Sequence, residues 1–275
     1  MKINVLVDNQ DNADLIGEHG LSLYIESCDK RVLCDMGSSD IFAKNALRLG
    51  VDLSKIDFGF ISHAHSDHIG GLPYFLENYS DTGVYVSERV FLSRYYFSTR
   101  RETEHNLTPN FEQLDRFRNR LHRVNHNCWL TEGIAAVYCD CQEYSQPLGN
   151  SFLYKRSADG VVEKDNFDHE MALVFQESDG LVVISSCSHC GVVNILRSCC
   201  EFTGINRVKS FVGGLHLTDG EMVAEEVERL FKEIESHFCG VRIYTGHCTG
   251  SRAKELLTER LHAVKIFRTG DCIEI

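Results

Sequence analysis

Alternation of apolar and polar positions predicts short strands along the first third of the chain. Leu21, Leu23 and Ile25 are apolar and the residues between them are not, a period of two that is typical of a strand with one buried face. Residues 58–62 are almost entirely apolar, which indicates a buried strand. The pattern predicts strands at residues 3–7, 21–26, 31–35, 58–62 and 84–87, and helices at 41–49 and 72–78.

The second half of the chain repeats this plan with longer helices. Strands are predicted at residues 133–138, 171–176, 181–186, 208–212, 241–244 and 264–267, and helices at 191–201, 219–237 and 250–262. Two β-rich halves with helices outside them predict an α/β fold, a four-layer αββα sandwich with the active site at a shared sheet edge. No linker rich in proline, glycine and serine separates the halves, so we expect residues 1–275 to form a single domain.

Residues 89–127 differ in composition from the rest of the chain. They hold eight arginines against four acids, mixed with phenylalanine and tyrosine, in a chain whose formal net charge is -12. One interpretation is a lid over the active site, in which guanidinium groups such as Arg100 and Arg101 bind a phosphate and aromatic rings stack on a flat heterocycle. The other is a solvated helical insertion with amphipathic packing. The sequence leaves both interpretations open.

Composition is ordinary for a globular protein and argues against several functions. A hydrophobic fraction of 43% with 25% charged residues is usual for a chain with a buried core. The acidic balance argues against a general nucleic-acid binder, and no apolar run has the length of a membrane span. The N-terminus lacks the signal order of basic, apolar and small residues, so we expect a cytoplasmic protein whose twelve cysteines are mostly reduced.

Metal-binding side chains are concentrated directly after the predicted strand at 58–62. Three imidazoles and a carboxylate fall within six residues, namely His63, His65, Asp67 and His68. In an extended chain His63 and His65 point to the same side, so one ion can take both. Asp67 and His68 follow at the turn, where they can bind a second ion a few ångströms away. The spacing predicts a dinuclear metal centre.

A dinuclear centre needs further ligands, and the second half offers histidines directly after apolar strands. His189 follows the strand predicted at 181–186 and His247 follows the strand at 241–244, so both are expected to bind metal. His216 lies two residues past a glycine pair in a similar setting. His216 could also be a metal ligand, but we favour a role facing the substrate as a hydrogen-bonding or acid-base group.

The sequence His-Ala-His-Ser-Asp-His at 63–68 resembles the His-x-His-x-Asp-His signature of the metallo-β-lactamase fold superfamily. The resemblance implies that Asp35 supports the metal histidines, although from the residues alone Asp35 equally fits a helix cap. Most members supply a bridging Asp where this chain has Cys187, so Cys187 is either a soft metal ligand or the bridge is missing. His169 sits where many members place another ligand and is a further candidate.

Further motifs make the resemblance more specific. They are Glu18-His19-Gly20-Leu21-Ser22, Cys187-Ser188-His189, Gly213-Gly214-Leu215-His216-Leu217 and Thr245-Gly246-His247-Cys248-Thr249-Gly250. Together they resemble the superfamily branch named for 7,8-dihydropterin-6-methyl-4-(β-D-ribofuranosyl)aminobenzene 5′-phosphate synthase, over nearly the whole chain. That family joins a dihydropterin methylene pyrophosphate to a ribosyl-aminobenzene phosphate and releases pyrophosphate. The resemblance also makes His19 a candidate for substrate binding.

These observations predict a metal-dependent enzyme that acts on a phosphorylated or pterin-like small molecule. Two divalent ions would hold the anionic leaving group while His216 manages a proton. The first alternative is a phosphodiesterase-like hydrolase in which a metal-bound hydroxide attacks and Asp67 orients it, and the second is a metal-binding sensor without catalysis. Zinc is the favoured metal, with iron, manganese and nickel as alternatives. We expect a small anionic substrate, no nucleic-acid or membrane partner, and leave homo-oligomer formation open.

Overall fold

The chain divides into two compact units, each built from separate segments. The computed structural model describes residues 1–79, 82–101, 103–260 and 263–275. Unit 1 comprises Met1–Asn125, Phe152–Asp165 and Arg268–Ile275, and unit 2 comprises His126–Ser151 and Asn166–Phe267. The expectation of a single domain over residues 1–275 stays a prediction.

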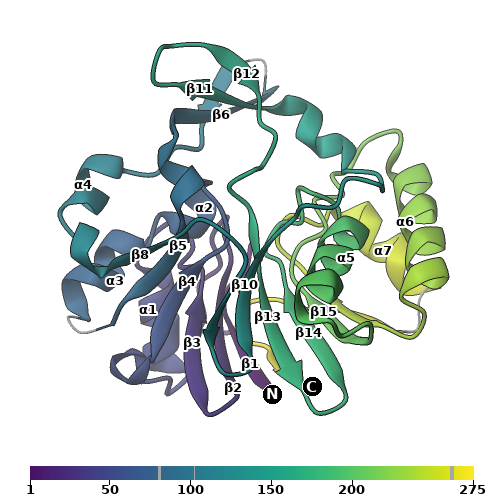
Figure 1. The fold of residues 1–275 in the computed structure, drawn as a ribbon, viewed down its shortest axis with the longest axis horizontal. Helices are drawn as coiled ribbons and strands as arrows, with labels where there is room; N and C mark the ends of the chain where they lie inside the picture. The colour runs from purple at the N-terminus through teal and green to yellow at the C-terminus, as the bar shows by residue number, and fades with distance from the viewer. Residues whose placement is uncertain (80–81, 102, 261–262) are drawn as a thin grey trace. The chain divides into compact units, whose positions relative to one another are not determined.

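The main sheet of unit 1 mixes antiparallel and parallel strands (Figure 1). Across the sheet the strands are Cys272–Glu274 (β18), Lys2–Val7 (β1), Ser22–Ser27 (β2), Lys30–Cys34 (β3), Phe58–Ile61 (β4), Val84–Ser87 (β5) and Leu121–Val124 (β8). From β18 to β3 neighbours pair antiparallel, and from β3 to β8 they pair parallel. The carboxyl ends of β3 and β4 therefore meet at one edge, where Asp35 and the histidine motif follow their strands.

The helices of unit 1 are short. They are Ile41–Arg48 (α1), Ser66–Ile69 (α2), Leu72–Asn78 (α3) and Phe111–Asp115 (α4), with 3₁₀ turns at Leu53–Lys55 (η1), Glu88–Phe91 (η2) and Arg118–Arg120 (η3). α1 packs against β1 and buries Phe42, Ala43 and Ala46. Gly71 joins α2 to α3, and a Cβ atom there would lie 2.1 Å from the Met36 carbonyl oxygen, so the chain can pass this point only with glycine.

A separate small sheet in unit 1 has the order β12-β11-β6-β7 (Figure 1). Its strands are Val162–Lys164 (β12), Leu153–Ser157 (β11), Ser93–Arg101 (β6) and Thr103–Asn106 (β7), all paired antiparallel. The interpretation of residues 89–127 as a helical insertion is wrong, because most of the ordered structure in this segment is β6, β7 and β8. β6 is held as a strand by β11, which lies outside the segment and could not be paired with it from local pattern.

The sheet of unit 2 places its parallel strands together. Across the sheet the strands are Val264–Ile266 (β17), Arg242–Thr245 (β16), Val208–Val212 (β15), Gly180–Ile184 (β14), Met171–Glu177 (β13), Ile134–Tyr138 (β10) and Cys128–Thr131 (β9). β14, β15, β16 and β17 run parallel to one another, and the remaining neighbours pair antiparallel. The carboxyl ends of β14, β15 and β16 therefore share one sheet edge.

Amphipathic helices cover the sheet of unit 2 (Figure 1). They are Val192–Thr203 (α5), Val223–His237 (α6) and Ser251–Arg260 (α7), and a 3₁₀ turn spans Leu148–Phe152 (η4). α5 packs against β10 and β13, α6 against α5 and α7, and α7 against β17. α6 buries Val223, Val227, Leu230 and Ile234, whose spacing puts them on one face of the helix.

The strands and helices predicted from apolar periodicity are present. The helix predicted for 219–237 begins later, at Val223, and residues 261–262 of the helix predicted for 250–262 lie outside the described residues. The small sheet and β18 were not predicted. Within the described ranges, none of the helices combines the length and hydrophobicity that crossing a membrane requires.

Candidate metal centre

Imidazoles of unit 1 converge at the carboxyl end of β4. The ring centroid of His63 lies 4.8 Å from that of His65 and 4.2 Å from that of His68, and all three side chains are buried. His65 has extended backbone dihedrals, so the alternation of side chains brings it to the same side as His63. The structure therefore brings the histidines of the predicted motif together within unit 1.

Asp35 fixes the orientation of His68. Its fully buried carboxylate accepts hydrogen bonds from the backbone N–H of Ser62 at 2.8 Å, from the Ser62 hydroxyl at 2.7 Å and from His68 Nδ1 at 2.8 Å. Because a carboxylate can only accept, Nδ1 of His68 donates to Asp35, and Nε2 is the nitrogen that would face a metal ion after losing its own proton. The expected contact between Asp35 and a histidine of the motif is present. Metal binding by that histidine stays a prediction.

The same hydrogen bonds set the tautomer of His63. The Ser62 hydroxyl gives its hydrogen to Asp35, so its oxygen must accept from Nδ1 of His63 at 2.8 Å. In neutral His63, Nε2 is then the unprotonated nitrogen. A neutral imidazole whose other nitrogen is held by a hydrogen bond is the form that binds transition metals.

Asp67 links the cluster to a more exposed histidine. Its Oδ2 atom lies 3.4 Å from Nε2 of His68 and 3.4 Å from Nε2 of His19, whose side chain is 66% exposed. Burial alone would lower the pKa of His68, but the charge of Asp67 and hydrogen bonds to Asp35 and Asp67 raise it to about 10. The two carboxylates therefore favour positive charge at this place, and the buried nitrogen and oxygen donors fit a divalent cation.

His65 has a partner that the sequence did not indicate. Nε2 of His65 lies 3.7 Å from the carboxylate of Asp165, which follows β12 and is buried. His65 also contacts an aromatic residue: its ring centroid lies 6.3 Å from the ring centroid of Tyr96 on β6. No local motif marked Asp165, since it comes a hundred positions after His65.

The candidate ligands of unit 2 follow its parallel strands. Cys187 and His189 come after β14, His216 after β15 and His247 after β16, so the shared edge brings them together. Cys187 Sγ lies within 4.8 Å of a ring nitrogen of each of these histidines. The ring centroids of His189 and His216 are 4.2 Å apart. Nitrogen and sulfur donors at these separations fit a transition metal such as zinc.

Several residues at this sheet edge of unit 2 have strained backbone conformations. Ser188, His216 and His247 have φ angles of 58°, 48° and 44°, in the left-handed region that residues with a Cβ seldom adopt. Gly214 is also required, because a Cβ atom there would lie 2.3 Å from Cys248 Sγ. Such conformations persist where surrounding structure enforces them, and they cluster at functional sites.

Residues that the sequence analysis missed hold His189 in place. Asn150 donates its amide to the His189 carbonyl at 2.7 Å and accepts from His189 Nδ1 at 3.1 Å, which leaves Nε2 unprotonated. The ring of Phe167 stacks on His189 at 4.3 Å. The buried carboxylate of Glu170 accepts the backbone N–H groups of His189 and Cys190 at 2.9 and 2.8 Å. Burial raises the pKa of Glu170 above its ordinary value, although these hydrogen bonds oppose the shift.

A second sulfur lies in the unit 2 cluster. Burial would raise the pKa of the Cys248 thiol, but hydrogen bonds with Cys187 and His216 and the charges of His247 and His216 bring it well below its usual range. The backbone N–H of His216 donates to Cys248 Sγ at 3.3 Å. In the sequence, Cys248 stands out only as part of the motif at residues 245–250. With Cys187 it gives this cluster a soft donor character.

Three predicted residues are not among the members of the groups described above. His169 is buried with its ring edge-on to Phe167 at 6.2 Å, and in the described part of the chain no group of metal-type side chains includes it. Arg100 and Arg101 are exposed at the end of β6, where the guanidinium carbon of Arg100 lies 5.9 Å from the ring centroid of Phe152. Their role in substrate binding stays a prediction.

Comparison with known protein families shows which family the histidine motif resembles. Residues 15–138 match the family model described as the metallo-beta-lactamase superfamily, and this range contains the whole histidine motif. This region of the chain is similar to the metallo-β-lactamase superfamily. The α/β fold of that superfamily, predicted from the sequence, is confirmed.

Similar proteins cover nearly the whole length of the chain. It is 29% identical to the 7,8-dihydropterin-6-methyl-4-(beta-D-ribofuranosyl)-aminobenzene-5'-phosphate synthase of Methanocaldococcus jannaschii, over 94% of this chain and 92% of the relative. It is 28% identical to the solved structure of Tm1679, a metal-dependent hydrolase of the beta-lactamase superfamily, with a TM-score of 0.83 over 100% of this chain and 99% of that chain.

A more distant structure shares only the fold. Zn(2+)-bound PqqB from Methylobacterium extorquens has a TM-score of 0.55 and 11% identity over 100% of both chains. The resemblance to the synthase branch, inferred from short motifs, is confirmed as a similarity over most of the chain.

Proposed function

We propose that the chain is a metal-dependent enzyme that acts on a phosphorylated or pterin-like small molecule. One observation carries the proposal: in unit 1, His63 and His68 are buried and each is held through Nδ1 by a hydrogen bond, so that Nε2 of each ring is the nitrogen that can bind a metal ion. A structural histidine needs no such arrangement, whereas a metal ligand does. The similarity to the M. jannaschii synthase supports the substrate class.

The proposed ligands are those predicted from the sequence. They are His63, His65, Asp67, His68, His189 and His247, with Cys187 as a soft ligand in place of an acid. Bound divalent ions would lower the pKa of water and neutralise an anionic group. Zinc suits the nitrogen and sulfur donors, and iron, manganese and nickel are alternatives.

The remaining residues bind the substrate and handle protons. Asp67 accepts hydrogen bonds and orients the attacking group, and exposed His19 beside it contacts an anionic part of the substrate. His216 takes or delivers a proton, because its Nδ1 atom is buried without a hydrogen-bond partner among the described residues. These roles follow from position and chemistry within each unit.

A hydrolase is the second candidate. The similarity to Tm1679, named a metal-dependent hydrolase, supports it. The same donors serve hydrolysis and group transfer, so the ligand set does not separate the two reactions. They differ in the acceptor, which is water in a hydrolase and the aminobenzene compound in a synthase.

The acceptor is therefore what the experiment should vary. Purified protein is incubated with the dihydropterin methylene pyrophosphate, with and without the ribosyl-aminobenzene phosphate, and pyrophosphate release is followed. Release that depends on the second compound identifies a synthase. Release without it, or cleavage of bis(4-nitrophenyl) phosphate, identifies a hydrolase.

Matched variants connect activity to the metal. His68→Ala should lose both bound metal, measured by elemental analysis, and turnover, because His68 is a proposed ligand. His105→Ala, which removes an exposed histidine of β7, should keep both. A parent protein that binds less than one metal per chain, or a His68→Ala variant with full metal content, would contradict the proposal.

A further inference from the structure

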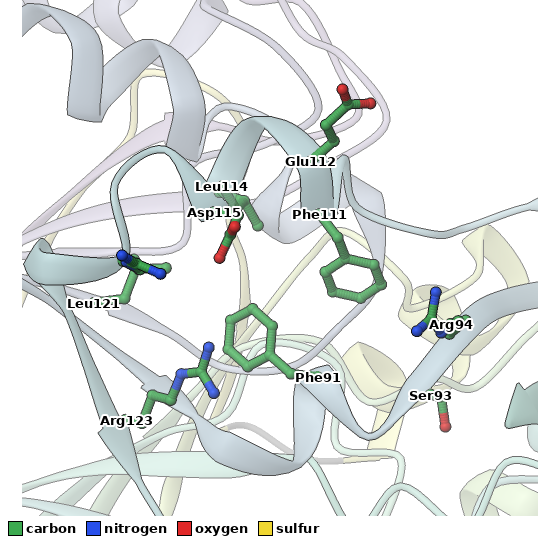
Figure 2. Close-up of a pocket in the computed structure, with 10 residues that line it drawn as sticks. Phe91, Ser93, Arg94, Phe111, Glu112, Leu114, Asp115, Leu121 and Arg123 are labelled. Carbon is green, nitrogen blue, oxygen red and sulfur yellow. The ribbon is translucent and has the colours of Figure 1, made fainter. Parts of the chain in front are cut away.

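A pocket of about 490 Å³ lies in unit 1, within the basic aromatic segment. Figure 2 shows the side chains around it, which come from η2, the start of β6, α4, η3 and β8. Its volume is within the range of pockets that hold small molecules. Neither Arg100 nor Arg101 lines it, so it is distinct from the phosphate site suggested for them.

Guanidinium groups on this pocket are not neutralised by ion pairs. Among the residues that the structure describes, no carboxylate lies within ion-pair distance of Arg94, Arg118 or Arg123. Arg116 on the same segment differs, because it pairs with Glu77 at 3.4 Å. In a chain whose net charge is -12, three unpaired cations around one pocket favour an anionic occupant.

The acids on the lining do not cancel this charge. Glu112 and Asp115 also line the pocket, so the count is three guanidiniums against two carboxylates. Figure 2 shows the carboxylate of Glu112 directed away from the rings of Phe91 and Phe111.

Aromatic rings form another part of the lining. The ring centroids of Phe91 and Phe111 are 5.8 Å apart, with 52° between their planes. The guanidinium carbon of Arg123 lies 4.3 Å from the ring centroid of Phe91, close enough for a cation–π interaction. Buried Leu114 and Leu121 add apolar surface. The pocket thus combines ring faces with a guanidinium held beside them.

An irregularity in β6 turns Arg94 toward the pocket. Neighbouring residues of a strand point to opposite faces, yet Ser93 and Arg94 both line the pocket. The pairing explains this, because Tyr95 and Ser93 oppose consecutive residues of β11 and Arg94 is the extra residue of a β-bulge. Bulges often re-aim a side chain next to a binding site.

We infer that this pocket binds a small molecule with an aromatic ring and a phosphate-like anion, the ring against Phe91 and Phe111 and the anion against Arg118 and Arg123. The inference is independent of the proposed reaction, because binding here needs no metal. β6 also connects the pocket to the metal cluster, since Tyr96, two residues after Arg94, contacts His65.

Binding of 1-naphthylmethylphosphonate to the purified chain, measured by calorimetry, tests the inference. Its carbon–phosphorus bond resists hydrolysis, so turnover cannot obscure binding. Methylphosphonate supplies the anion alone and 1-naphthalenemethanol the ring alone. We expect the complete probe to bind at least tenfold more tightly than either part, because it engages both the rings and the guanidiniums.

Variants locate the site. Arg118→Gln and Arg123→Gln should each weaken binding about tenfold or more, since each removes a charged hydrogen-bond donor. Arg116→Gln, a matched loss of one arginine outside the pocket, should bind as the parent does. Metal content should be the same in all three variants. The inference is overturned by a parent that does not bind the probe, by equal binding of probe and methylphosphonate, or by equal weakening in Arg116→Gln.

Discussion

Replacing Asp35 with asparagine tests how the unit 1 cluster is organised. Oδ2 of Asp35 accepts from both the Ser62 hydroxyl and His68 Nδ1, and Oδ1 accepts from the Ser62 backbone. In the Asp35→Asn variant an amide N–H₂ group takes the place of one oxygen. If the amide oxygen keeps the backbone hydrogen bond, the amide faces the Nδ1 proton of His68. The proton must then move to Nε2, the nitrogen that is needed for metal.

The magnitude follows from the hydrogen bond that is lost. A hydrogen bond to a charged group contributes roughly 1.5–3 kcal/mol, which corresponds to about a 10- to 100-fold change in a binding constant. Residues that orient metal ligands have effects of about this size on metal affinity. We therefore expect Asp35→Asn to weaken zinc binding about 10- to 100-fold although Asp35 need not touch the metal.

Zinc affinity can be measured by competition with a chromophoric chelator. Asp57→Asn is the matched control, because it also removes one negative charge from unit 1. Asp57 is partly exposed, and its carboxylate accepts a hydrogen bond from the backbone N–H of Arg31 at 2.8 Å. In metal-free protein, Asp35→Asn should also lower the pKa of His68 from about 10, measured by NMR titration. Zinc affinity equal to that of the parent would refute the reasoning.

Three further substitutions, two of them with a matched control variant, give expectations for the core and the second cluster. Phe60→Ala should lower the free energy of unfolding in urea by about 3–5 kcal/mol because Phe60 is fully buried, whereas Leu47→Ala at an 81% exposed position should change it by less than about 0.5 kcal/mol. Glu170→Ala should cost about 2–4 kcal/mol in the same assay, since it leaves two buried backbone N–H groups without their acceptor; an unchanged transition would count against that. Cobalt-substituted protein should show a thiolate-to-metal absorption band that Cys187→Ala abolishes and Cys239→Ala, at an exposed site, retains.

Secondary structure was predictable where burial leaves a period in the sequence. β4 and β14 are buried along their whole length, and α6 buries one helical face, so apolar runs and helical spacing identified them. β6 was not identified, because its Arg100 and Arg101 end is exposed and its partner β11 comes from a distant segment. Strands held by remote pairing lack a local signal.

For the candidate site too, only the residues that are close together in the sequence were predictable. His63, His65, Asp67 and His68 are neighbours in the chain, so their spacing revealed a cluster before any fold was known. The acids and amides that hold the histidines come from elsewhere. Asp165 beside His65 has no motif around it, and no local pattern connects the two residues.

The sequence by itself determined the resemblance to the metallo-β-lactamase superfamily, the order of the main elements and the chemical identity of the proposed ligands, because local spacing carries that information. Only the tertiary structure decided which nitrogen of each histidine is held by a hydrogen bond, through Asp35 for His68 and Asn150 for His189. It also decided that residues 89–127 contribute two strands of a small sheet and a basic aromatic pocket. Those outcomes depend on hydrogen bonds and strand pairs between residues far apart in the chain, which no local pattern encodes.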